Sequence, residues 1–379
     1  MSIDDSAAGL GDERARLTYA DAGVDVEAGD RAVELMRSAV AATHGREVLG
    51  GIGGFAGLFD ATALTRYRRP LLATSTDGVG TKVAVAPALD RHDTIGFDLV
   101  GMVVDDIVVT GATPLFMTDY IACGRVVPER IAALVGGIAA ACREVGVALV
   151  GGETAEHPGL LGPDEYDVAG AATGVVEADD LLGPERVRTG DVLVAMASSG
   201  LHSNGYSLVR RVVAEAGLTL DSAVPELGRT LGDELLEPTR LYARPCLALA
   251  ADPACGVHAF THVTGGGLAA NLARVLPGGL HAVVDRSSWV VPPVFGLVAR
   301  LGNVPPDDLE RTLNMGVGMV AVVASPGVDA TLSALTSAGL PAWVMGKVRS
   351  GDLAAGRGTQ RAKGMAGGSV ELVGELKLA

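Results

Sequence analysis

Cysteine is scarce in this chain of 379 residues, which contains only Cys123, Cys142, Cys246 and Cys255. No two of them form a Cys-x-x-Cys pair, and none has zinc-finger spacing. This scarcity excludes a disulfide-stapled secreted domain and a structural zinc module. We therefore expect reduced, mostly structural thiols and a cytoplasmic protein.

Basic residues are also few: the chain has 30 Lys and Arg residues against 45 Asp and Glu residues, which gives a formal net charge of −15. This balance argues against nucleic acid or an anionic membrane as a partner. Charged residues or glycine interrupt every apolar run before about 18 residues, so no membrane-spanning helix is expected. Residues 1–16 are acidic and lack the apolar core of a signal peptide, and we expect a mobile N-terminal tail there.

The chain is instead rich in hydrophobic residues (48%) and in glycine (52 residues). Apolar strand-like runs alternate with helical patterns, which predicts an α/β fold with mixed sheets. We place an N-terminal domain at 17–177 and a C-terminal α/β domain at 178–350, since a polar, turn-rich segment follows residue 176. Residues 351–379 are predicted to be a Gly-rich tail, with a terminal strand near 370–373.

The stretch 76–82, Thr-Asp-Gly-Val-Gly-Thr-Lys, follows an apolar run typical of a short buried strand that ends just before Asp77. The carboxylate suits a hard cation such as magnesium. Glycines let backbone N–H groups approach phosphate oxygens, and the lysine adds a compact positive charge. The pattern favours a magnesium–polyphosphate site, with a plain polar turn as the alternative, and it lacks Walker A spacing. The candidate residues are Asp77, Gly78, Gly80, Thr81 and Lys82.

Residues 48–59 are dense in glycine, and 51–56 match a loose Gly-x-Gly-x-x-Ala pattern. A dinucleotide site of this kind needs a strand before the glycines and a helix after them. Here the expected order is a helix over 28–43, a glycine loop and a short apolar run. A flexible loop that closes over a ligand is therefore the favoured interpretation.

Acidic residues occur at two further places that could face the same ligand. Apolar spacing predicts a helix over 93–111, which Asp98, Asp105 and Asp106 interrupt, and acids on a buried helix are costly unless paired or metal-bound. Glu153 follows paired glycines at the end of the predicted strand 147–150. Convergence of these acids with Asp77 on one cation is the hypothesis, and a solvated helix edge is the alternative.

Two loops in the second half lead into predicted helices. Residues 198–205, Ser-Ser-Gly-Leu-His-Ser-Asn-Gly, precede a helix over 206–216, and 264–267, Thr-Gly-Gly-Gly, precede a helix over 268–276. Free N–H groups and the helix dipole favour phosphate at such positions. Helix capping alone explains either loop equally well.

The combined motifs resemble the phosphoribosylformylglycinamidine cyclo-ligase family, also called aminoimidazole ribonucleotide synthetase. The matching stretches follow the family order: 19–25, 53–55, 76–82, 111–116, 150–156, 198–210, 237–240, 262–267 and 311–319. The resemblance implies a homodimer whose N-terminal domains join their sheets in a barrel-like interface. It implies binding of ATP and magnesium near the glycine-rich segment, and conversion of formylglycinamidine ribonucleotide and ATP to aminoimidazole ribonucleotide, ADP and phosphate.

The resemblance also implies residue roles. ATP would contact the 76–82 stretch together with Gly53 and Gly54, and Lys82 would contact the transferring phosphate. The metal would be held by Asp77, Asp106 and Glu153. The family usually has Asn where this chain has Asp105, so the choice between Asp105 and Asp106 as metal ligand stays open. The substrate would be held by His202, also a candidate for proton transfer, and by Ser203, Asn204, Thr264, Gly265, Gly266 and Gly267.

Other members of the same ATP-binding superfamily are the nearest rivals. Selenophosphate synthetase would require a reactive Cys or selenocysteine near the N-terminus, and the first cysteine here is Cys123. The hydrogenase-maturation dehydratase would want a C-terminal Cys, whereas this chain ends in Ala379. Thiamine-monophosphate kinase does not share the 203–207 and 264–267 stretches in this form. A non-catalytic nucleotide-binding subunit is the rival from another class.

Overall fold

The first domain is built on a four-stranded mixed sheet. The computed structural model describes residues 17–351, 353, 359–361 and 367–378. In strand order, the sheet contains β3 (Pro70–Gly78), β6 (Tyr166–Glu177), β4 (Thr113–Cys123) and β5 (Ala148–Glu156). Strand β6 pairs antiparallel with both neighbours, while β4 and β5 are parallel. Strands β3 and β5 are therefore the outer strands.

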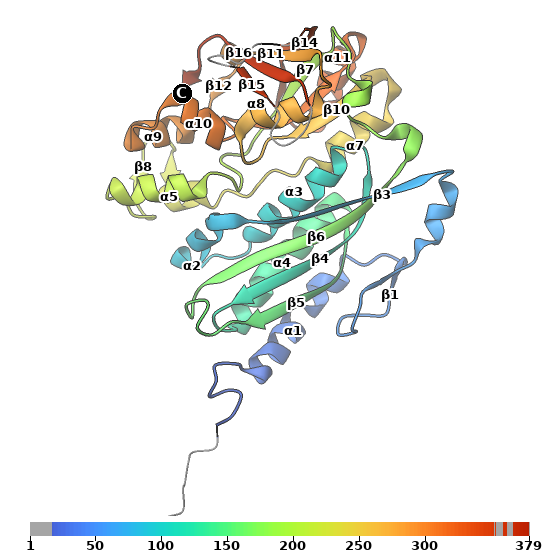
Figure 1. The fold of residues 1–379 in the computed structure, drawn as a ribbon. Helices are drawn as coiled ribbons and strands as arrows, with labels where there is room; N and C mark the ends of the chain where they lie inside the picture. The colour runs from blue at the N-terminus through green and yellow to red at the C-terminus, as the bar shows by residue number, and fades with distance from the viewer. Residues whose placement is uncertain (1–16, 352, 354–358, 362–366, 379) are drawn as a thin grey trace, which may run out of the picture.

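Three helices lie along one side of this sheet (Figure 1): α1 (Val26–Ala41), α3 (Ile95–Val108) and α4 (Pro128–Val145). Helix α4 connects the parallel strands; Pro128 suits its first turn, and it stops at Gly146 in the left-handed region at φ +77°. The opposite face of the sheet carries Leu72 and Tyr120, whose side chains are 64% and 40% exposed. One face of the sheet is thus covered within the chain and the other carries exposed apolar groups.

The second domain contains a seven-stranded sheet in the order β10-β13-β7-β14-β11-β16-β15. Strand β13, which is rich in Val, is buried along its whole length, as expected for an inner strand. The strands are β7 (Val192–Ala197), β10 (Val257–His262), β11 (Leu280–Asp285), β13 (Val317–Val323), β14 (Ala342–Ser350), β15 (Thr359–Arg361) and β16 (Ser369–Val373). Its longer helices are α5 (Tyr206–Glu215), α7 (Ala243–Ala251), α9 (Pro293–Gly302) and α11 (Val328–Ser337).

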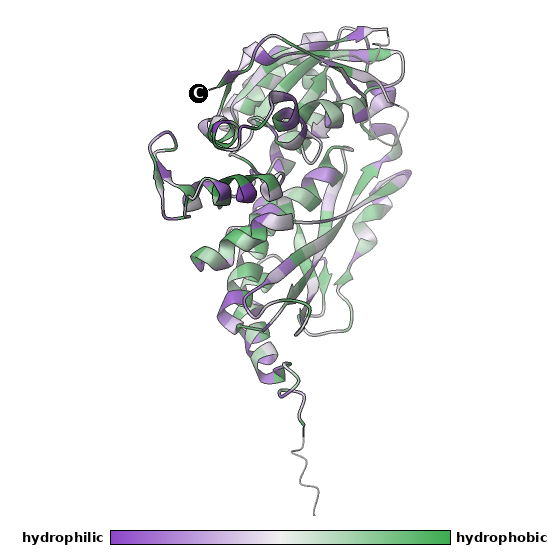
Figure 2. Cartoon of the chain, turned by 60° about the vertical axis from the view of Figure 1, so that its left-hand side comes forward, coloured by the Kyte–Doolittle hydropathy of each residue, from purple (hydrophilic) through white to green (hydrophobic). Residues whose placement is uncertain are grey.

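Shorter elements complete the described part of the chain. They include α2 (Val85–Leu89), α6 (Leu231–Leu235), α8 (Gly267–Leu272), α10 (Pro306–Thr312) and the 3-10 helix η2 (Gly80–Ala84). Short strand pairs are formed by β1 (Val48–Leu49) with β2 (Leu58–Phe59), β8 (Ala223–Val224) with β9 (Arg229–Thr230), and β12 (Val290–Val291) with β17 (Lys377–Leu378). Figure 2 shows hydrophobic residues along the central strands and polar residues on outer helices and loops. No helix among the described residues is both long and apolar enough to cross a bilayer.

The mixed α/β prediction is confirmed, and several expected elements lie where the sequence put them. Two strands run further than predicted: β3 continues through Asp77 to Gly78, and β5 continues through Glu153 to Glu156, because neighbouring strands pair with them over these positions. The predicted tail 351–379 is also corrected, since β16 pairs parallel with β11 inside the sheet. The terminal strand near 370–373 is confirmed as part of β16. The predicted tail 1–16 lies outside the described residues.

Candidate active site

Asp77 occupies the end of β3, on the sheet face that packs against α3. Its partner across the strand pair is Gly170, and a Cβ atom built on Gly170 would lie 3.4 Å from a methyl of Leu99 in α3. The half-buried carboxylate accepts a 2.8 Å hydrogen bond from the Gly78 N–H. Burial raises the pKa of Asp77, and the charge of Asp106 adds to that rise. Asp77 and Asp106 therefore lie close enough for their charges to interact.

Asp106 lies near the end of α3 and meets His262, the last residue of β10. The Oδ1 atom of Asp106 is 3.0 Å from Nδ1 of His262. The side chain of Asp106 is 41% exposed, whereas that of His262 is 3% exposed. Burial alone would lower the pKa of His262, but the hydrogen bond to Asp106 and the surrounding carboxylates raise it. Sequence reasoning missed His262, although a histidine between an apolar strand and Thr-Gly-Gly-Gly was a usable signal.

Asp105, the neighbour of Asp106, has a different environment. Its fully buried carboxylate accepts the backbone N–H of Tyr242 at 3.1 and 3.2 Å, at the start of α7. Burial raises the pKa of Asp105 to about 7, against the opposing effect of His262. The two acids thus have different partners in the second domain: Asp105 accepts the Tyr242 N–H, while Asp106 contacts the His262 side chain. This geometry favours Asp106 as the metal-ligand candidate.

Lys82 is fully buried, which differs from the expected phosphate contact. Its Nζ atom donates to Asp98 Oδ1 at 2.7 Å and to the carbonyl oxygens of His202 and Glu237 at 3.1 and 2.6 Å. These three acceptors match the three N–H donors of an ammonium group. Burial lowers the pKa of Lys82 and raises that of Asp98, and each partner's charge opposes the other's shift. The lysine is held by the junction of the two domains and is not directed at a ligand.

Glu153 does not join Asp77 within one chain. The register aligns Asp77, Gly170, Asp119 and Gly152 across the four strands, so these positions share a face and Glu153, one residue on, lies on the other. Three strand spacings, about 14 Å, separate β3 from β5. Over the described ranges, no group of three or more His, Cys, Asp or Glu side chains is arranged to hold a metal ion. The predicted single-chain convergence of Asp77, Asp106 and Glu153 is therefore corrected.

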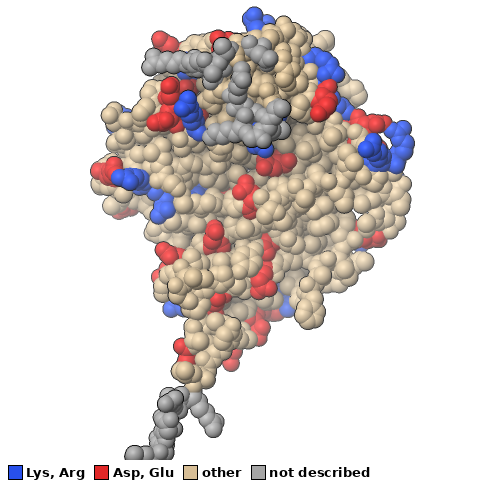
Figure 3. All heavy atoms as spheres, in the orientation of Figure 1, with Lys and Arg blue, Asp and Glu red and all other residues tan. Residues whose placement is uncertain are grey.

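The glycine-rich segment lines a cavity of about 860 Å³ between α1, α4 and the edge of β5. Gly53 and Gly54 lie in its wall, and β1 and β2 flank the segment as a hairpin, so the strand–glycine–helix order of a dinucleotide site is absent here. On the lower part of the face shown in Figure 3, which the first domain forms, most of the charged side chains are acidic. Among the residues that the structure describes, the wall contains no Lys, Arg or His; its acids are Asp25, Asp30, Asp119, Glu153 and Glu156. An anion would enter this cavity only with a cation.

Residues 199–205, between β7 and α5, are called the substrate loop after their predicted role. His202 is 2% exposed, adopts φ +58°, and its Nε2 accepts the Ser199 N–H at 3.1 Å. Burial lowers the pKa of His202 well below its ordinary 6.5, and the nearby cations lower it further. The ring is enclosed by protein, which does not favour the expected role in proton transfer, and that role stays a prediction. Ser203 is also buried, with Oγ 3.1 Å from Thr239 Oγ1.

Asn204 and the 264–267 turn come together at the domain junction. A Cβ atom built on Gly265 would lie 3.4 Å from Asn204 Oδ1, and the Asn204 amide lies 3.7 Å from Met102 Sδ in α3. Gly266 and Gly267 have φ +103° and +76°. The Gly267 N–H already donates to the Thr264 carbonyl at 3.1 Å. Gly265 and Gly266 thus remain the better backbone candidates for an anionic ligand.

Comparison with known proteins gives two family matches. Residues 60–176 match the family described as AIR synthase related protein, N-terminal domain, and residues 188–357 match its C-terminal domain. A phosphoribosylformylglycinamidine cyclo-ligase from Anaeromyxobacter sp. is 52% identical over 336 residues, covering 88% of this chain and 96% of that protein. The protein of the same name from Geobacillus kaustophilus is 50% identical over 334 residues, with the same coverage of 88% and 96%.

Solved structures with a similar fold are more distant in sequence. A thiamine-monophosphate kinase from Stenotrophomonas maltophilia has a TM-score of 0.65 at 21% identity, covering 91% of this chain and 96% of that one. The hydrogenase maturation protein HypE in complex with ATP has a TM-score of 0.63 at 20% identity, covering 92% of each chain. At this identity the likeness concerns the fold alone.

Proposed function

We propose that this chain catalyses the ATP-dependent closure of formylglycinamidine ribonucleotide to aminoimidazole ribonucleotide. The reason is that the chain belongs to the phosphoribosylformylglycinamidine cyclo-ligase family. An amide oxygen is a poor leaving group, and phosphorylation by ATP makes it a good one. A nitrogen of the same substrate then attacks the activated carbon, closing the five-membered ring and releasing phosphate; the other product is ADP. This is a ligase reaction of purine biosynthesis, for which a cytoplasmic location remains our prediction.

The observation that carries the proposal is the pair of carboxylates at the domain junction. Asp77 lies at the end of β3, which packs against α3, and Asp106 of α3 contacts His262, two residues before the 264–267 turn. Asp98, Met102 and Asp106 are spaced by four residues on α3 and so share the face toward the second domain. Met102 contacts Asn204 of the substrate loop. Phosphoryl transfer needs mainly positioning and charge neutralisation, and this junction supports both.

Magnesium fits the two carboxylates, because Mg²⁺ is commonly bound by one or two carboxylates together with waters and substrate phosphates. Asp77 and Asp106 would hold it, and it would neutralise the phosphate charge of ATP. The wall of the glycine-rich cavity is mostly glycine and apolar residues, and the charged residues described in it are acidic, so it fits the nucleoside end of ATP better than the bare triphosphate. Gly53 and Gly54 remain proposed nucleotide contacts there, as do Gly78, Gly80 and Thr81 near Asp77.

A homodimer is the second part of the proposal. The uncovered sheet face carries exposed Leu72 and Tyr120, and β3 and β5 have free outer edges within the described chain. Joining the sheets of two copies would bring the Glu153 edge of one copy toward the Asp77 edge of the other. Glu153 would then remain a ligand candidate, contributed across the dimer. The ribose phosphate is proposed to bind the amides of Gly265 and Gly266.

The test is to mix the protein with formylglycinamidine ribonucleotide, ATP and magnesium and to measure aminoimidazole product and ADP. Asp77→Asn should cut turnover by orders of magnitude while the protein keeps its fold and association state, because one anion of the metal site is lost. Wild-type turnover in that variant would refute the site assignment. ATP hydrolysis independent of the ribonucleotide would favour a kinase-like or non-catalytic member of the superfamily.

A further inference from the structure

We propose that Lys82 and Asp98 are positioning residues that fix the substrate loop, residues 199–205, against the first domain. This inference rests on the proposed function, which assigns the ribonucleotide to that loop. Both side chains are fully buried, their ion pair measures 2.7 Å, and neither reaches a cavity wall of the glycine-rich segment. Lys82 and Asp98 therefore act on the reaction indirectly, by fixing the backbone segments to which they are hydrogen-bonded.

Lys82 holds two backbone carbonyls of the second domain. One belongs to His202, a non-glycine residue in the left-handed region at φ +58°. That conformation is unfavourable for a residue with a Cβ atom and persists only where the surroundings impose it. The ammonium bond at 3.1 Å to the His202 carbonyl is one such constraint, and the Ser199 N–H bond to the imidazole is another. The turn at His202 sets the directions of Ser203 and Asn204.

Asp98 holds Thr239, which belongs to a second segment of the same domain, residues 237–242, called the strip below. Its Oδ1 accepts both the backbone N–H and the hydroxyl of Thr239, at 2.9 and 2.7 Å. The Thr239 hydroxyl lies 3.1 Å from that of Ser203. A continuous chain of bonds thus runs from α3 through Thr239 into the substrate loop.

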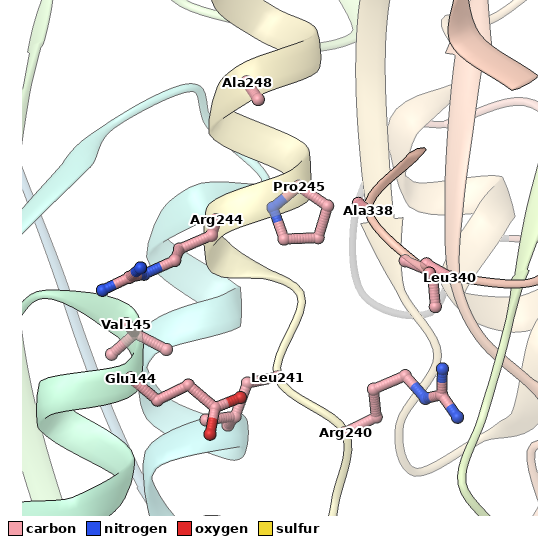
Figure 4. Close-up of a pocket in the computed structure, with 10 residues that line it drawn as sticks. Glu144, Val145, Arg240, Leu241, Arg244, Pro245, Ala248, Ala338 and Leu340 are labelled. Atoms are coloured by element: carbon pink, nitrogen blue, oxygen red, sulfur yellow. The ribbon is translucent and has the colours of Figure 1, made fainter. Parts of the chain in front are cut away.

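The strip that includes Thr239 packs against α3 on one side, where a Cβ atom built on Gly101 would lie 2.7 Å from Thr239 Cγ2. Its next residues, Arg240 and Leu241, line an open cavity of about 460 Å³, with Pro245 and Leu340 among the other walls (Figure 4). Packing on that side therefore cannot fix the strip. The buried bonds from Asp98 and Lys82, together with the Asp105 contact at Tyr242, provide the restraint.

The chain offers a matched control ion pair between the same domains. Arg91 contacts Asp233 at 2.5 Å, but their side chains are 46% and 42% exposed. Water and salt screen this pair, and it touches neither the substrate loop nor Thr239. Arg91→Met thus removes an interdomain ion pair without removing a restraint on the loop.

The experiment compares Thr239→Val and the charge-compensated double variant Lys82→Met/Asp98→Asn with Arg91→Met. We expect KM for the ribonucleotide to rise about tenfold and kcat/KM to fall about a hundredfold, the scale of misplacing a reactant by about 1 Å. In Thr239→Val the Kd of ATP should change less than about twofold, because Thr239 does not line the glycine-rich cavity and sites without shared contacts are nearly independent. Backbone amides of residues 199–205 should exchange faster with deuterated solvent in both variants, and at the wild-type rate in Arg91→Met.

A lowered melting temperature with unchanged ribonucleotide KM and unchanged loop exchange would overturn the inference, because the pair would then act only in stability. If the double variant does not fold, Thr239→Val decides by the same two measurements. If the wild-type protein forms no aminoimidazole product, the proposed function fails. The exchange comparison would still test whether Lys82 and Asp98 fix the loop.

Discussion

Gly318, in the buried strand β13, is the position where one added methyl group should do most harm near the substrate loop. A Cβ atom built there would lie 1.9 Å from Tyr242 Oη and 2.6 Å from His202 Cε1. Both rings are buried, and Tyr242 Oη donates a 2.8 Å hydrogen bond to the Ala197 carbonyl. To reach the ordinary contact distance of 3.4 Å, the tyrosine oxygen would have to move about 1.5 Å.

Gly318→Ala should therefore lower the free energy of unfolding of the second domain by about 2–5 kcal/mol, combining overpacking with loss of the tyrosine hydrogen bond. Urea unfolding followed by tryptophan fluorescence is the assay, because the chain's only two tryptophans, Trp289 and Trp343, lie in that domain with ring centroids 6.0 Å apart. Gly278→Ala is the control: no atom lies within 4 Å of its added Cβ, and its stability should stay within about 0.5 kcal/mol.

A double-mutant cycle with Tyr242→Phe identifies the cause of the loss. Removing the tyrosine oxygen relieves the closest contact, so the double variant should be less destabilised than the two single effects added, by about 1 kcal/mol. The relief stays partial because Tyr242 Cζ would still lie 2.7 Å from the new methyl. Unfolding of Gly318→Ala at the wild-type urea midpoint would refute the steric argument.

Two further substitutions separate structural acids from functional ones. Asp105→Ala should cost about 1–3 kcal/mol in urea unfolding, because the buried Tyr242 N–H loses its acceptor, whereas Asp106→Asn should mainly abolish ADP release; equal stability of Asp105→Ala and wild type would contradict this assignment. Burial raises the pKa of Asp119 from 3.8 to about 7, so the folded state binds its proton more tightly than the unfolded chain and stability from this group is lost as pH rises through about 7. Asp119→Asn should flatten the fall in melting temperature across that window, and an unchanged pH profile would exclude Asp119 as its source.

Local sequence signals predicted the elements well. Helix α4 was readable from the proline at its start and the glycine after its end, and β6 from its run of small and branched residues. The association of Asp77 with α3 also followed from a strand end beside an acid-bearing helix. These features depend on segments that lie near one another in the sequence.

Long-range pairing decided what the sequence could not predict. Glu153 and Asp77 looked equivalent as acids beside glycines, yet β6 and β4 lie between their strands. Strand order is set by pairing between distant segments, for which no local pattern exists. Lys82 likewise resembled a phosphate ligand, and its burial depends on the carbonyls of His202 and Glu237, which lie 120 and 155 residues further on.

The separation of Asp98 from Thr239, 141 residues later, has a consequence for synthesis. While the ribosome is still making the second half, the emerging first half holds Lys82, Asp98 and Asp105, whose partners from the second domain do not yet exist. Water must reach these charges until the strip around Thr239 arrives, so α3 cannot dock fully during that interval. A fragment that stops at Glu177 should therefore remain loosely packed and dependent on chaperones, even though it contains every strand of its own sheet.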